Sequence, residues 1–202
     1  MDRIEPGYAP HKRLEEDVVL YLECMGYYTF EATYHTVLDP EIKDLLSRTF
    51  NPTALYIRGR ADRVALHWNQ EPTFEWEAKT HQSSKYHDMT IEALPLAHHI
   101  IKNKLGVRCL YAYGSPFDNT NYGFWVDDLP PVKLVMIPNT RWTSAGVEFY
   151  NKVFESVFKD SKIINMDKTK GSNDPFVIID EGAKKKLKDW RILIDEISHD
   201  TP

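Results

Sequence analysis

The chain has little cysteine, and this excludes one class of cofactor site. Its 202 residues include two cysteines, Cys24 and Cys109, each inside an apolar pattern and with no second cysteine nearby. An iron–sulfur cluster with four cysteine ligands therefore cannot form within the chain. We expect both side chains to be buried free thiols.

Long apolar runs are absent as well. No stretch approaches the length of a membrane span, and residues 1–6 lack the apolar core of a signal peptide. We therefore expect a cytoplasmic protein with no membrane partner. The Gly-x-x-x-x-Gly-Lys-Ser/Thr loop is missing too, so the chain encodes no nucleotide-driven motor.

An excess of positive charge is also lacking, because the formal net charge is −5. A protein that passively coats nucleic acid is normally basic, so this class is disfavoured. An enzyme that acts on nucleic acid stays compatible, since it carries its own acidic metal ligands. What the chain does have is a globular composition, with 42% hydrophobic and 27% charged residues, and a length that suits a single domain over residues 1–202.

The order of the apolar patterns predicts an α/β fold. A helix is expected over residues 11–25, followed by strands over 27–36, 54–68 and 73–80, a helix over 89–105 and a strand over 107–113. One central mixed sheet flanked by helices is the natural solution, with an αβββαβ core over about 11–113. The C-terminal additions over 114–202 include an expected edge strand at 176–179 and a helix over 181–197.

Three charged residues are expected to meet on one face of this sheet. The strand over 54–68 carries Asp62, and the next strand carries Glu77-Ala78-Lys79. Alternate side chains of a strand point to the same face, so Glu77 and Lys79 share a face and Ala78 faces away. If the two strands pair as a hairpin, Asp62 reaches that same face.

These residue types fit phosphodiester hydrolysis with Mg²⁺ or Mn²⁺. Asp62 and Glu77 would supply oxygen ligands, and the backbone carbonyl of Ala78 would supply a third. Lys79 would orient the attacking water or stabilise the phosphate, because the two carboxylates favour its charged form. We therefore interpret Asp62, Glu77 and Lys79 as catalytic residues.

With these motifs, residues 11–113 resemble the PD-(D/E)xK nuclease superfamily, which has the restriction-endonuclease-like fold. The resemblance is carried by the element order, by Asp62 and by Glu77-Ala78-Lys79, and Gly59-x-x-Asp62-Arg63 is similar to a stretch of the RecB-like exonuclease branch. It implies metal-dependent cleavage of DNA, with the two acids as ligands and the lysine in catalysis. The Gln-x-x-x-Tyr that usually follows in that branch is not evident here.

The resemblance also implies a metal ligand early in the first helix. Archaeal Holliday-junction resolvases place a glutamate there, ahead of a Gly-aromatic pair, and Glu15 stands eleven residues before Gly26-Tyr27. Glu15 borders the apolar stripe of the helix, whereas Glu16 points further toward solvent. We therefore choose Glu15 over Glu16 and Asp17.

The segment after Lys79 offers candidate substrate contacts. His81 is close enough in sequence to contact phosphate, Gln82 could replace the missing glutamine, and Lys85 follows two serines in an expected loop. The implied partner is DNA, with RNA left open, and many relatives act as homodimers. A phage or mobile-element nuclease, or a repair or recombination nuclease, would suit the small single domain.

Simpler interpretations stay open. Asp62 could pair with Arg60 or Arg63, and Glu77 and Lys79 could belong to a solvated strand face. On the same fold, a non-catalytic module that binds nucleic acid or protein is the alternative function.

Four histidines fall within residues 81–99, and their spacing argues against a zinc site. It matches neither His-x-x-x-His nor His-Glu-x-x-His, so we interpret them as ordinary surface or half-buried residues. They are His81, His87, His98 and His99.

Overall fold

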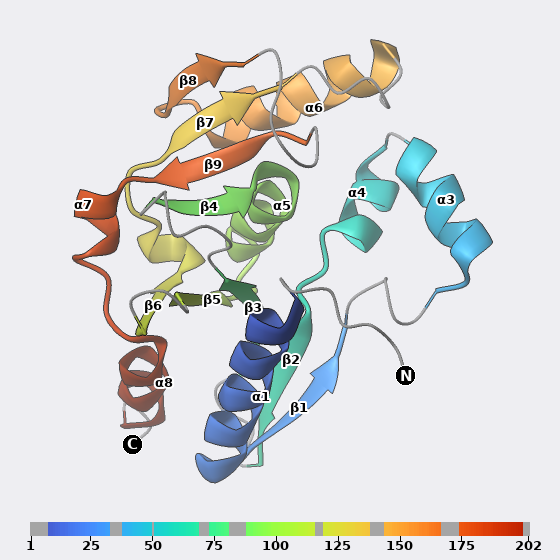
Figure 1. The fold of residues 1–202 in the computed structure, drawn as a ribbon. Helices are drawn as coiled ribbons and strands as arrows, with labels where there is room; N and C mark the ends of the chain where they lie inside the picture. The colour runs from blue at the N-terminus through green and yellow to red at the C-terminus, as the bar shows by residue number, and fades with distance from the viewer. Residues whose placement is uncertain are drawn as a thin grey trace.

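The chain forms two β-sheets with helices between and around them, as the computed structural model in Figure 1 shows. The structure describes residues 8–32, 38–49, 51–68, 73–80, 88–115, 119–137, 144–166 and 174–199. Within these ranges, no helix is both long enough and apolar enough to cross a lipid bilayer.

The larger sheet is built mainly from the N-terminal half of the chain. Its strands, in spatial order, are β1 (Tyr27–Glu31), β2 (Arg63–His67), β3 (Phe74–Thr80), β5 (Cys109–Ser115) and β6 (Thr120–Trp125). β3 and β5 run parallel, and the other neighbouring pairs are antiparallel. Every residue of β5 is buried, as expected for a central strand with both faces covered.

Helices cover both faces of this sheet. α1 (Tyr8–Cys24) and α8 (Trp190–His199) pack on the face that carries Trp76 and Ala78. α5 (Ala93–Asn103) packs on the opposite face, against Tyr111. Two helices are inserted before β2 and one short strand before α5, but the order α1, β1, β2, β3, α5, β5 keeps the predicted αβββαβ succession. The predicted α/β fold class, with a central mixed sheet flanked by helices, is confirmed.

α1 forms because its apolar residues recur at helical spacing. Leu14, Val18 and Leu22 are all buried against the sheet. Gly26 ends the helix with a φ of 86°, a conformation that other residues rarely adopt. Cys24 lies off the apolar stripe and is exposed, so the prediction of a buried thiol was wrong there and correct for Cys109.

The second sheet was not predicted as a separate layer. Its strands, in spatial order, are β4 (Met89–Glu92), β9 (Phe176–Ile179), β7 (Lys133–Met136) and β8 (Lys162–Asn165). Residues 89–92 are a strand rather than the start of a helix, because buried and exposed side chains alternate along them. β9 pairs with both β4 and β7, so it is an interior strand and not the predicted edge. α6 (Ser144–Val157) packs against this sheet.

The strand predicted over residues 54–68 was wrong in its first half. That part belongs to α4 (Pro52–Arg58), which follows α3 (Pro40–Arg48). The Asn51 side chain accepts a hydrogen bond from the Ala54 N–H at 2.8 Å, and Pro52 occupies the first turn, where its missing N–H is not needed. Asp62 therefore lies between α4 and β2 and not inside a strand.

The helix predicted over 181–197 is interrupted. α7 (Glu181–Lys184) ends early, and Lys188 then pairs with β6, where its carbonyl accepts the Gly123 N–H at 2.8 Å. α8 begins only afterwards, with Trp190 fully buried. A short 3-10 helix, η1 (Val126–Asp128), follows β6.

Candidate active site

Asp62 lies where the chain leaves α4 and enters β2. At Gly59 the chain passes so close to α5 that an added Cβ would lie 2.4 Å from the His98 side chain. A glycine is therefore needed three residues before Asp62, which gives the Gly59-x-x-Asp62 spacing a packing reason. Arg63, the next residue, places Nη2 3.3 Å from Oε1 of Glu31 on β1, so its ion-pair partner is Glu31.

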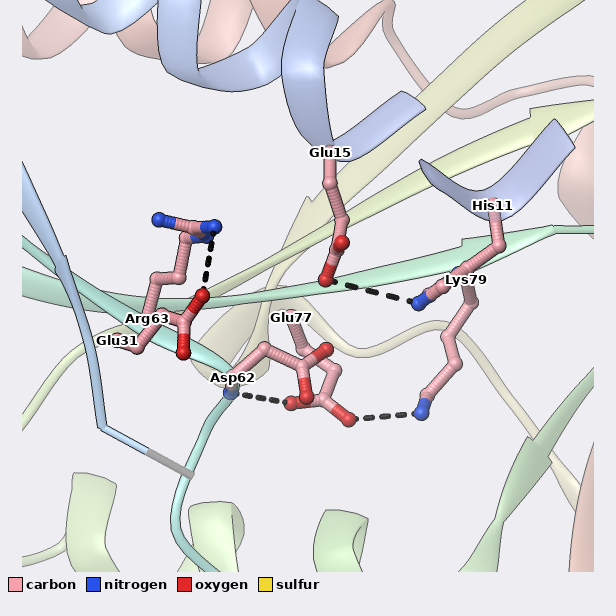
Figure 2. Close-up of polar contacts among 7 residues, drawn as sticks. All are labelled: His11, Glu15, Glu31, Asp62, Arg63, Glu77 and Lys79. Carbon is pink, nitrogen blue, oxygen red and sulfur yellow. Dashed lines mark hydrogen bonds and ion pairs between the residues drawn. The ribbon is translucent and has the colours of Figure 1, made fainter. Parts of the chain in front are cut away.

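β3 brings Glu77 and Lys79 to the same point. The Lys79 Nζ lies 2.7 Å from the Glu77 Oε1, and the Asp62 backbone N–H donates to the Glu77 Oε2 at 3.0 Å (Figure 2). β2 and β3 pair as the expected hairpin, with Arg63 opposite Trp76. The structure thus brings Asp62, Glu77 and Lys79 together, and Glu77 bridges the other two residues.

Burial and charge set different protonation states within this group. Burial, and then the Glu77 carboxylate, raises the pKa of Asp62 from 3.8 to about 7. Burial alone would also raise the pKa of Glu77, but the Lys79 ammonium outweighs it and holds that pKa below its ordinary value. Burial would lower the pKa of Lys79, but Glu77 and Glu92 hold it above its ordinary value. Lys79 is therefore a stable cation.

α1 adds two side chains from the opposite side of the group. Glu15 and His11 project from its first turns toward Asp62, and the His11 Nε2 lies 3.6 Å from the Glu15 Oε1 (Figure 2). One ligand atom each of His11, Glu15 and Asp62 lie within 4.8 Å of one another. Glu16 instead has a side chain 60% exposed and pairs with Lys12. The structure thus places Glu15, and not Glu16, beside Asp62.

One oxygen of Asp62 shows that these residues fit a cation. Asp62 Oδ2 is buried, and no hydrogen-bond donor reaches it from the part of the chain that the structure describes. A buried carboxylate oxygen without a partner is costly unless something else binds it. Oxygens of Asp62 and Glu15 converge there, and oxygen ligands suit Mg²⁺ or Mn²⁺.

The backbone of Ala78 is oriented toward the same place. The Ala78 side chain is fully buried on the α1 side of the sheet, and its backbone N–H donates a hydrogen bond to Asp62. The N–H and C=O of one strand residue point toward the same neighbouring strand. The Ala78 carbonyl therefore faces the side on which Asp62 lies.

The predicted substrate contacts remain untested, and two residues near the site were not found from the sequence. His81, Gln82 and Lys85 lie outside the described residues, so their predicted substrate contacts stay predictions. His11 was missed, although its spacing of four residues from Glu15 places both on one helix face. His99 was interpreted as a surface or half-buried residue, but it is fully buried and its field acts on Glu77 from α5, so that interpretation was wrong. No sequence signal links His99 to β3, because their proximity comes from packing.

Comparisons with known proteins add a structural likeness. No protein-family model matches the sequence, and no curated protein matches it. Among solved structures, Hjc, a Holliday junction resolvase of the archaeal hyperthermophile Archaeoglobus fulgidus, is similar over 92% of this chain and 98% of that chain. The TM-score is 0.45 and the sequence identity is 13%. A match at this level assigns no activity to the chain.

Proposed function

We propose that this chain is a metal-dependent deoxyribonuclease that hydrolyses phosphodiester bonds, with Asp62, Glu77 and Lys79 as catalytic residues. The observation that carries the proposal is the buried Asp62 Oδ2, which has no partner within the described residues although it lies among acids that share one ammonium. Ionised Glu15, Asp62 and Glu77 carry three negative charges against the single positive charge of Lys79. One divalent cation would make the group neutral.

Four groups would hold that cation: the carboxylates of Glu15, Asp62 and Glu77, and the backbone carbonyl of Ala78. When bound, Mg²⁺ or Mn²⁺ supplies charge neutralisation at the phosphate and an acidified water. The carboxylate and carbonyl oxygens of these groups suit a hard cation such as Mg²⁺ or Mn²⁺, and a nitrogen of His11 lies within 4.8 Å of the Glu15 and Asp62 ligand atoms.

The chain's own residues would position the substrate and the water. Lys79 stays protonated beside Glu77, so it acts as a donor: it can orient a water or bind a phosphate oxygen, but it does not serve as a base. The Asp62 N–H holds Glu77 through its second oxygen, which orients that carboxylate. His11 contacts Glu15 and limits the freedom of its side chain. His81, Gln82 and Lys85 are proposed to contact the substrate.

Cleavage assays with Mn²⁺ and with Mg²⁺ test this proposal. Linear, circular, single-stranded and four-way-branched DNA would be compared with RNA, each with and without a chelator. We expect metal-dependent cleavage of DNA, and we expect Asp62→Asn to lower the rate at least about 10³-fold, because several kcal/mol of stabilisation are lost. Asp160→Asn, an exposed carboxylate after α6, is the matched control and should cleave normally.

The pattern of substrates would refine or overturn the assignment. Digestion of linear DNA with circular DNA intact indicates an exonuclease, and preference for the branched substrate indicates a recombination type rather than a phage or mobile-element type. Cleavage of RNA alone makes the chain a ribonuclease. A folded chain that binds no Mn²⁺ by calorimetry and cleaves nothing is instead a binding module, and the nuclease proposal is then wrong.

A further inference from the structure

A second group of metal-ligating side chains lies deeper in the same face of β3. Glu75 of β3, Cys109 of β5 and His99 of α5 each place one ligand atom within 4.8 Å of the other two. Glu75 and Cys109 are directly paired in the parallel ladder, and His99 reaches them from the helix that covers this face. We name these three residues the inner cluster.

Two atoms of the inner cluster are buried without a partner among the described residues. They are His99 Nε2 and Glu75 Oε2. The His99 side chain is fully buried, and its Nδ1 lies 2.7 Å from the Tyr111 Oη, which leaves Nε2 as the free ring nitrogen. The other oxygen of Glu75 pairs with the Lys102 ammonium. Each residue thus has one engaged atom and one atom free to bind a ligand.

The donor types select a class of metal. One sulfur, one imidazole nitrogen and one carboxylate oxygen form a set typical of Zn²⁺, and they are too soft for Mg²⁺. In a tetrahedral zinc site such atoms lie about 3.2–3.8 Å apart. The inner cluster therefore needs a contraction of at most about 1.6 Å between any two ligand atoms, which side-chain rotation can supply.

The partners of these ligands are those of a metal site. A metal-bound histidine usually engages its second ring nitrogen in a hydrogen bond, and here the Tyr111 hydroxyl lies beside His99 Nδ1. Metal-binding carboxylates are usually hydrogen-bonded as well, and here the Lys102 ammonium pairs with Glu75. Glu75 retains a side-chain exposure of 15%, and this offers a route of entry from solvent.

We propose that Glu75, His99 and Cys109 bind Zn²⁺ through Oε2, Nε2 and Sγ, separately from the catalytic group. The Cys109 thiol loses its proton to solvent on binding, so the thiolate and the Glu75 carboxylate offset the charge of the ion, and with the Lys102 ammonium the group keeps one net positive charge. Water occupies the fourth position. The ion ties β3, β5 and α5 together beneath Glu77, and its role is structural. This site does not depend on the proposed function.

Cobalt substitution in the metal-free chain of 202 residues tests the site. Co²⁺ bound to a thiolate gives a charge-transfer absorption that oxygen ligands do not give. We expect one equivalent of Co²⁺ to produce this band, and one equivalent of Zn²⁺ to remove it. Cys109→Ser should abolish the band, and Cys24→Ser, which removes the exposed cysteine of α1, should leave it intact. Asp62→Asn should also leave it intact, which separates this site from the catalytic one.

Several outcomes would overturn the zinc site. One is a wild-type chain with no thiolate band, which would make the inner cluster a metal-free polar group. Another is a band that survives Cys109→Ser or disappears with Cys24→Ser. If Cys109→Ser fails to fold by circular dichroism, His99→Gln provides the second variant, and a band retained there with unchanged Co²⁺ affinity also contradicts the proposal.

Discussion

Two groups of ionisable side chains share one face of β3, and they differ in donor atoms and in exposure. The outer cluster, defined as Glu15, Asp62, Glu77 and Lys79 with His11, contains carboxylates and one ammonium, and several of its side chains are about one-quarter exposed. The inner cluster begins two residues earlier, at Glu75, and contributes sulfur, nitrogen and oxygen from an almost fully buried position.

The exposure and the donor atoms of each cluster decide which chemistry it can support. Substrate can reach only a site with solvent access, so the outer cluster suits turnover of a polymer. A buried set with a thiol suits an ion that stays in place. Glu75 of the inner cluster and Glu77 of the outer cluster are alternate residues of β3. Their side chains therefore point to the same face of the sheet and lie two residues apart along the strand.

The largest expected effect concerns the pH dependence of the metal-free protein. Because the pKa of Asp62 is raised in the folded state, the folded chain binds more protons than the unfolded chain between pH 3.8 and about 7. The contribution of Asp62 to stability is therefore lost as pH rises through this window, by up to about 4 kcal/mol. Urea unfolding in chelator at pH 4.5 and pH 7.5 measures it.

Asp62→Asn is the matched variant for this measurement, since the amide does not titrate. The variant should gain stability relative to wild type as pH rises from 4.5 to 7.5. Equal pH slopes for the two proteins would contradict a raised pKa at Asp62. The inner cluster is unchanged in both proteins, so the difference isolates the outer one.

Removal of the ammonium should be the next largest effect. Lys79→Met leaves the buried Glu77 carboxylate without its cation, and we expect a loss of about 2–3 kcal/mol in the free energy of unfolding at pH 7, because the lysine itself is partly exposed. Adding Glu77→Gln to Lys79→Met should recover part of this loss in the same urea titration. A double variant no more stable than the single one would show that the pair is not coupled.

The inner cluster should respond to a residue that is not itself a ligand. Tyr111→Phe removes the hydroxyl beside His99 Nδ1, and loss of such a partner weakens metal binding about 10–100-fold. The Co²⁺ titration measures this affinity. Tyr113→Phe, two residues further along β5 and on the same face of the sheet, is the control and should bind Co²⁺ normally. Equal affinities in the two variants would remove Tyr111 from the site.

The smallest expected effect compares two adjacent glutamates. Glu15→Gln should weaken Mn²⁺ binding about tenfold, because it removes one charged ligand from the outer cluster. This factor corresponds to about 1.4 kcal/mol of binding free energy. Glu16→Gln, whose side chain is 60% exposed, should bind Mn²⁺ as wild type does. Calorimetry on both proteins measures the difference. A larger loss of Mn²⁺ affinity in Glu16→Gln than in Glu15→Gln would assign the metal ligand to Glu16 instead.

Local signals predicted much of the core. The spacing of Leu14, Val18 and Leu22 gives α1 its buried face, and Gly26 ends it. Alternation along β3 puts Glu77 and Lys79 on one face. The errors at residues 54–58 and 89–92 arose where short segments carried both helical and strand patterns.

The sequence by itself determined the buried face of α1, the position of Glu15 at the border of that face, and the shared face of Glu77 and Lys79, because strand and helix periods are local properties. Only the tertiary structure decided that Cys109, His99 and Glu75 meet, that Asp62 has a buried oxygen without a described partner, and that a second sheet exists. These features depend on strand order and helix packing, which join residues far apart in the chain and leave no short-range pattern.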